Sequence, residues 1–149
     1  MTPGRAVIAL RRVLSLVIAL AALVAAWALT QPFHEVTIQG ADAPVMHTGL
    51  THHSWGLMFI PTALVLAVAG IAGAWSARPR ALVFARVTAI AALTWSLVVL
   101  TDGLLTDYLM TRGPALLGEQ VFLAARAVIA GAGVALAALA FRERAGSAS

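Results

Sequence analysis

The chain has 149 residues, of which 61% are hydrophobic and only 11% are charged. Its mean hydropathy is +0.93. Soluble domains carry about 25% charged residues, and a chain of this length exposes too much of its surface to hide so many apolar side chains from water. The composition therefore excludes a soluble globular protein and predicts an integral membrane protein whose main contact is the lipid bilayer.

The residue types that are absent narrow the possible chemistry. The sequence has no cysteine, which excludes disulfides, thiolate metal sites and iron–sulfur clusters. The net charge of +4 comes from arginines that lie beside apolar runs and form no basic stripe, so nucleic acid is not an expected partner. The apolar runs are continuous rather than alternating, which also excludes a transmembrane β-barrel.

Four apolar segments are long enough to cross a membrane as helices, each of which needs about 20 residues. The first segment ends before Pro32, because a proline disfavours helical geometry in the residue that precedes it. Tryptophans at both ends of the second segment are typical of membrane interfaces. The expected spans are residues 13–30, 55–75, 81–101 and 121–141, with longer loops at 31–54 and 102–120.

The first long loop carries a strand-like pattern. Residues 35–39 alternate polar and apolar side chains, residues 40–44 have turn chemistry, and residues 45–48 can return as a second strand. We expect a small β-hairpin that packs on the helices or on a partner, because an isolated hairpin is only marginally stable in water.

The arginines predict how the chain lies in the membrane. Eight fall on the side of the N-terminus and two on the opposite side. By the positive-inside rule, both termini are cytoplasmic and loops 31–54 and 102–120 lie outside a bacterial inner membrane. The sequence thus predicts an all-α integral membrane fold in which residues 1–149 form one four-transmembrane-helix bundle, with a β-capable outer loop between the first two helices.

Spaced small residues and one tryptophan indicate how the helices pack. Without a hydrophobic force between helices in lipid, close packing needs residues such as glycine and alanine at every fourth position. The second span offers Ala69 with Gly73, and Gly70 with Ala74. The fourth span offers Ala127, Gly131 and Ala135, with Gly133 nearby. Trp95 falls in the middle of the third span and is expected in the core.

All four histidines lie in the first long loop, near two methionines. They are His34, His47, His52 and His53, and the methionines are Met46 and Met58. Imidazole and thioether groups suit copper(I), and three imidazoles can hold zinc or copper(II). The alternative is a set of interfacial residues that pair with headgroups or nearby acids. A bis-histidine haem is less favoured, because spans one, three and four contain no histidine.

Arg126 lies about two turns into the fourth span, where a charge is costly enough to need a partner or a water path. Candidate partners are Asp102 and Asp107, at the outer end of span three, and Glu119, on the same helix face as Arg126. Two interpretations remain. Either these residues form a polar site in the outer leaflet that binds an anionic headgroup or passes protons, or they form a structural ion pair.

No catalytic signature is present: the sequence has no phosphate-binding glycine loop, no His-Glu-x-x-His and no nucleophile elbow. We therefore expect a non-catalytic membrane protein that acts as an accessory or scaffold subunit of a larger membrane complex, with other subunits or further copies of itself as partners. An outer-face copper- or zinc-binding protein is the first alternative. An oligomeric small transporter with a polar path around Arg126 is the second.

Overall fold

The computed structural model describes residues 3–36, 45–53, 55–76, 80–109 and 114–145. Within these ranges, four helices are long and apolar enough to span a membrane. They are α1 (Pro3–Ala28), α3 (Gly56–Trp75), α4 (Arg80–Leu109) and α5 (Leu117–Ala145). The predicted mostly helical fold with four potential membrane spans is therefore confirmed.

Three of these helices are longer than their predicted spans. α1 begins at Pro3 rather than at residue 13, because proline is tolerated in a first helical turn and arginine is a good helix former. α4 continues through Asp102 and Gly103, which were expected in a loop, and α5 begins at Leu117 rather than at residue 121. A helix satisfies its own backbone hydrogen bonds, so it can continue beyond the apolar segment that defines its span.

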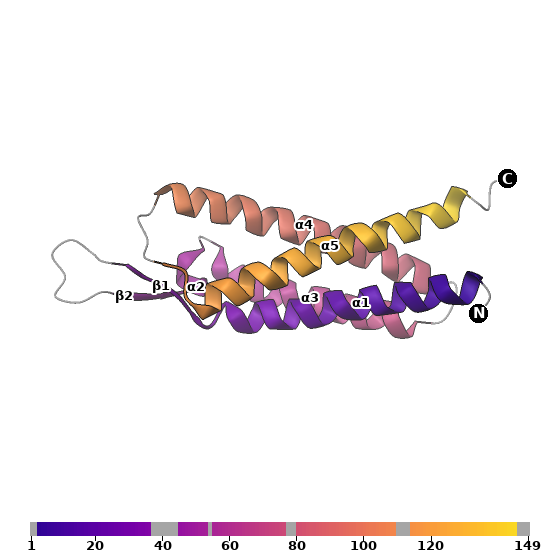
Figure 1. Cartoon of the computed structure of the whole chain (residues 1–149), viewed down its shortest axis with the longest axis horizontal. Coiled ribbons are helices and arrows are strands. Elements are labelled where there is room, and N and C mark those ends of the chain that lie inside the picture. The colour runs from indigo at the N-terminus through magenta and orange to yellow at the C-terminus, as the bar shows by residue number, and fades with distance from the viewer. Residues whose placement is uncertain (1–2, 37–44, 54, 77–79, 110–113, 146–149) are drawn as a thin grey trace.

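The four long helices form a bundle in which each packs against two neighbours. α1 and α4 lie on opposite sides of the bundle, and each packs against both α3 and α5. Successive long helices run in opposite directions, as short connections favour, so both termini lie at one end and the β-strands at the other (Figure 1). We call these the terminal end and the hairpin end.

Two short strands form the predicted pair at the hairpin end. β1 (Pro32–Val36) and β2 (Val45–Thr48) are antiparallel, with His34 opposite His47. β2 has its predicted bounds, whereas β1 begins before residue 35, and residues 37–39 of the expected strand lie outside the described ranges. A short helix, α2 (Gly49–His52), then leads towards α3. The Leu116 amide donates to the Phe33 carbonyl oxygen at 2.7 Å, which ties β1 to the start of α5.

Small residues bring the helices close together, although not at every predicted position. A Cβ on Gly70 of α3 would lie 2.6 Å from the carbonyl oxygen of Ser15 in α1. A Cβ on Gly133 of α5 would lie 3.2 Å from the Cβ of Ala92 in α4. At Gly131, by contrast, an added Cβ would meet no described atom within 4 Å. The predicted stripe through Gly131 is therefore wrong as a packing face, and Gly133 makes the contact.

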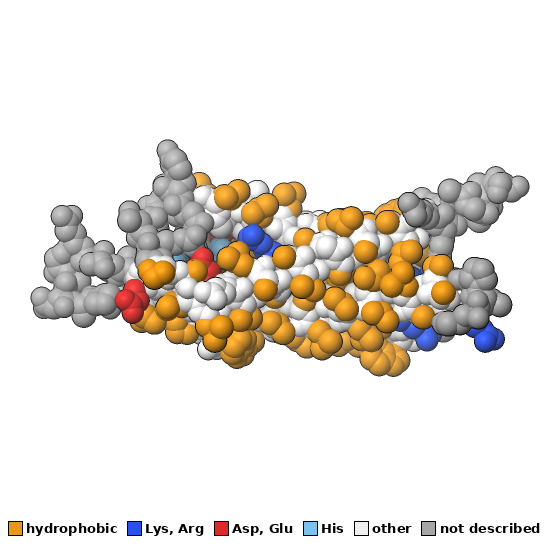
Figure 2. Space-filling model, in the orientation of Figure 1, with side chains coloured by type: hydrophobic (Ala, Val, Ile, Leu, Met, Phe, Trp, Pro, Cys, Tyr) orange, Lys and Arg blue, Asp and Glu red, His pale blue; other side chains and the backbone are white. Residues whose placement is uncertain are grey.

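The outer surface of the bundle is apolar. For example, Leu20, Val65 and Val134 are 63%, 69% and 59% exposed. Hydrophobic side chains cover much of the face seen in Figure 2. Such a continuous exposed apolar surface is suited to lipid contact. Trp95 is only 7% exposed, which confirms its predicted place in the core, and its ring lies against those of Phe59 and Phe122.

Candidate functional site

Several ionisable residues of the hairpin end gather in one buried cluster. Five of them are at most 7% exposed, although they come from four different parts of the chain. We call this set the histidine–carboxylate cluster: His34 of β1, His52 and His53 at the end of α2, Asp102 of α4 and Glu119 of α5. The extra turns of α4 and α5 beyond the predicted spans bring the two carboxylates to the histidines.

A short hydrogen bond in the cluster joins His53 to Asp102. Nδ1 of His53 donates to Oδ2 of Asp102 at 2.9 Å, and the two side chains are only 4% and 6% exposed. His53 ends α2 in an extended conformation, and its ring contacts those of Phe59 and Phe122. A charge-assisted hydrogen bond in such a dry position is stronger than one in water. It links the α2–α3 connection to α4.

A second pair joins β1 to α5. Nδ1 of His34 lies 3.7 Å from Oε2 of Glu119, with side-chain exposures of 0% and 6%. This distance is too long for a hydrogen bond, so the attraction is electrostatic and requires His34 to be protonated. The ring centroid of His34 lies 4.6 Å from that of His52 and 5.9 Å from that of His47. The structure therefore brings all four histidines together, as the proposed metal site requires.

Proximity alone does not make a metal site. Among the described residues, no three histidine, aspartate or glutamate side chains are arranged so that they could hold a metal ion. The two methionines of the predicted copper site, Met46 and Met58, are 49% and 58% exposed. Copper or zinc binding therefore stays a prediction that needs the histidine rings to reorient.

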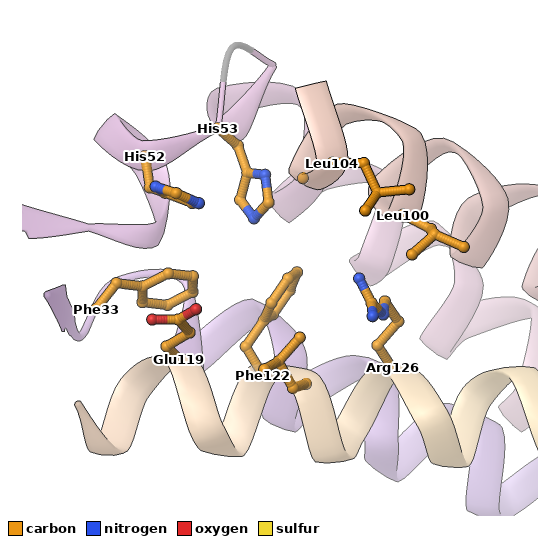
Figure 3. Close-up of a pocket in the computed structure, with 10 residues that line it drawn as sticks. Phe33, His52, His53, Leu100, Leu104, Glu119, Phe122 and Arg126 are labelled. Carbon is orange, nitrogen blue, oxygen red and sulfur yellow. The ribbon is translucent and has the colours of Figure 1, made fainter. Parts of the chain in front are cut away.

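A small cavity lies beside the cluster, between α4 and α5. Its volume is about 100 Å³. Figure 3 shows Glu119, Phe122 and Arg126 extending from α5 towards the opposite wall, where His53 and the α4 leucines lie. The lining residues are Phe33, His52, His53, Leu100, Gly103, Leu104, Glu119, Phe122, Leu123 and Arg126.

Arg126 is half-buried in the cavity wall. Within the described part of the chain, its guanidinium takes part in no hydrogen bond or ion pair, and Asp102, an expected partner, instead contacts His53. Glu119 lines the same cavity but lies against His34. The side chain of Asp107, the third expected partner, lies outside the described residues. The predicted polar site is thus partly assembled, with Arg126 and Glu119 on one cavity.

The metal site and the polar site were predicted as separate sets of residues, with pairing between histidines and nearby acids as an alternative. The structure shows such pairing, because His34 and His53 lie against Glu119 and Asp102. Neither set contained Phe33 and Phe122, which contact each other at 5.6 Å between ring centroids and both line the cavity. One signal was available: Asp102 and Glu119 flank apolar segments directly, so modest helix extensions place both carboxylates at the same end of the bundle.

The histidines and carboxylates of the cluster can bind and exchange protons, and Arg126 can donate hydrogen bonds to an anion. No family model matches the chain, and neither a curated protein nor a solved structure is significantly similar to it. Its function must therefore be inferred from the geometry of its own residues.

Proposed function

We propose that the chain is a non-catalytic accessory subunit that holds a transmembrane helix of another protein in a lateral groove of its bundle. In this proposal it resides in a bacterial inner membrane, with the hairpin end outside and both termini in the cytoplasm, as the arginine distribution favours. The observation that carries the proposal is the groove between α3 and α4.

The groove consists of two adjoining hollows. The larger has a volume of about 410 Å³, and the smaller, nearer the hairpin end, has about 190 Å³. Thr62 and Trp95 line both hollows. The α3 residues that line them extend from Met58 to Ala69, a distance of about 16 Å at 1.5 Å per residue. The groove is therefore about three helical turns long, which is enough for a helix to pack along it.

The chemistry of the groove suits a helix better than it suits a soluble ligand. Ala69 and Ala91 allow a neighbouring backbone to approach closely, and the exposed hydroxyl of Thr94 can bond across to it. Small residues and hydroxyls are the groups that drive helix association in lipid. The Trp95 indole Nε1 donates to Oγ1 of Thr62 at 3.1 Å, so the floor of the groove is held in place.

The proposal is tested by filling the groove. Ala69→Phe places an aromatic ring where the partner helix would pack, and Val134→Phe adds the same ring to an exposed position on α5. Tagged wild-type and variant chains are purified from their native membranes in mild detergent, and the proteins retained with each are compared. We expect one membrane protein to be retained by the wild type and by Val134→Phe, and to be lost from Ala69→Phe.

Retention of the same proteins by all three chains would contradict the proposal, as would a wild-type chain that is purified alone. Far-UV circular dichroism and the melting temperature of each variant show whether it is folded. A partner lost from a folded Ala69→Phe chain then reports on the groove itself.

The two alternative functions have less support. Copper or zinc binding lacks a ligand set in the described residues. Transport along a polar path needs more than the cavity at Arg126, whose volume of about 100 Å³ is confined to the hairpin half of the bundle. The α5 residues that line this cavity end at Arg126, whereas α5 itself continues to Ala145. The cavity therefore does not extend along the whole helix.

A further inference from the structure

We propose that the cavity between α4 and α5 binds a phosphate ester anion through the guanidinium of Arg126. The shape of the site favours a phosphate carried by a lipid headgroup, and a small soluble phosphate ester shares the same chemistry. This inference concerns a different face from the α3–α4 groove and does not depend on the proposed function.

Arg126 lies within a helix that is long and apolar enough to span a membrane. It lies nine residues after Leu117, the first residue of α5, which places its Cα about 13 Å along the helix axis. Ionisable residues inside a membrane are normally paired, because an isolated charge is costly there. Arginine keeps its charge at any physiological pH. Since no described side chain pairs with Arg126, an external anion is the natural counter-ion.

The two buried carboxylates of the hairpin end already contact histidines. Asp102 accepts a hydrogen bond from His53, and Glu119 lies beside His34. Each carboxylate therefore already has a histidine next to it, and although Glu119 also lines the cavity, neither carboxylate forms an ion pair with Arg126. A guanidinium binds phosphate with two parallel N–H···O bonds. The rings of His52 and His53 also line the cavity and supply further donors when protonated.

The cavity is small and opens towards the apolar surface of the bundle. Pockets for drug-sized ligands have volumes of about 300–1,000 Å³, whereas this one has about 100 Å³, so only a small group can enter. Three leucines line it and are also exposed on the apolar surface, at 39%, 61% and 41%: Leu100, Leu104 and Leu123. The mouth is therefore continuous with the lipid-facing surface, where acyl chains can lie on the leucines.

Figure 2 shows the same arrangement from outside. Arginine, histidine and acidic side chains appear next to one another near the start of α5, with hydrophobic side chains around them. Arginine side chains can reach from within a span towards the headgroups, so Arg126 can meet a headgroup phosphate near the start of α5. A lipid bound there would place its phosphate at Arg126 and its tails along α4 and α5.

The test is a titration of the purified full-length chain in lipid-free mild detergent, followed by native mass spectrometry. The probes are phosphatidylglycerol, which carries a phosphodiester on a lipid, and glycerol phosphate, which is soluble. We expect one phosphatidylglycerol to bind tightly per chain. Arg126→Leu should weaken this binding about tenfold or more, as expected for the loss of hydrogen bonds to a charged group. Arg12→Leu, which removes an exposed arginine of α1, is the matched control and should leave this tight binding unchanged.

A second pair of variants blocks the cavity without removing a charge. A Cβ on Gly103 would lie 3.6 Å from Cε1 of His53, an ordinary contact, so Gly103→Ala should fold and bind normally. Gly103→Leu should fill the cavity and weaken binding as much as Arg126→Leu does. Circular dichroism and melting temperature establish that each variant is folded before the titration.

The outcomes are distinct. Tight binding of phosphatidylglycerol that depends on Arg126 supports the lipid source, and equally tight binding of glycerol phosphate with the same dependence assigns the site to a soluble phosphate ester. Binding that Arg126→Leu and Gly103→Leu leave unchanged would overturn the proposal. So would binding that appears only in Asp107→Asn, because Asp107 would then be the counter-ion of Arg126.

Discussion

The hydrogen bond between His53 and Asp102 should stabilise the hairpin end by an amount that a double-mutant cycle can measure. Both side chains are more than nine-tenths buried and their polar atoms are 2.9 Å apart. Replacing either residue with alanine leaves the other in a dry environment without this partner. Hydrogen bonds to charged groups contribute about 1.5–3 kcal/mol, whereas hydrogen bonds between membrane helices average about 0.6 kcal/mol.

The position of the pair decides between these two values. It lies at the end of the bundle rather than at its middle, but the rings of Phe59 and Phe122 lie against His53. We therefore expect His53→Ala and Asp102→Ala each to lower the free energy of unfolding by about 2–3 kcal/mol. The double variant should lose about 1–2 kcal/mol less than the sum of the two, which is the coupling energy of the pair.

The assay is reversible unfolding by sodium dodecyl sulfate in mixed micelles, followed by far-UV circular dichroism. Thr101→Val is the matched control, because the Thr101 hydroxyl donates only to carbonyl oxygens of its own helix, at Leu97 and Val98. Its effect should add to that of His53→Ala within about 0.5 kcal/mol. If the effects of His53→Ala and Asp102→Ala on the free energy of unfolding also added within about 0.5 kcal/mol, the hydrogen bond would not stabilise the hairpin end.

Three further predictions follow from the packing and the chemistry. Gly70→Ala should lower the free energy of unfolding by about 1–3 kcal/mol, because its Cβ would lie 2.6 Å from the Ser15 carbonyl oxygen. Gly131→Ala should be neutral or slightly stabilising in the same assay, because its Cβ would meet no described atom within 4 Å. Trp95→Phe should cost at least about 0.5–1.5 kcal/mol, because it removes the hydrogen bond to Thr62 and part of a buried ring. An unchanged unfolding curve would contradict both contributions. Elemental analysis of protein purified without chelators should find well below one copper or zinc per chain; one equivalent that is lost when the histidines are replaced would revive the metal site.

The sequence predicted the membrane-spanning helices well, because their signal is strong. Long apolar runs separated by arginines and prolines leave little choice of architecture for a chain of this length. The strand at 45–48 followed from alternation and turn residues, and the buried position of Trp95 followed from its place in mid-span. Each of these depends on local pattern, which a single sequence contains.

The composition of the site was harder to predict, because it depends on where helices end and how they rotate. Asp102 was assigned to a loop near Arg126, but α4 continues past it and turns its carboxylate towards His53. In the same way, Gly131 and Gly133 are both small residues on α5, and only the rotation of the helix decides which one contacts α4. No pattern within one segment reports such a rotation.

Cross-linking in intact membranes tests the proposed partner helix most directly. The natural chain has no cysteine, so Ala91→Cys in the groove and Val134→Cys on α5 can each carry a single photoreactive maleimide. We predict that the probe at position 91 joins the 15.4 kDa chain to one other membrane protein and that the probe at position 134 does not. Adducts to lipid alone, to a second copy of this chain, or equally from both positions would contradict the account.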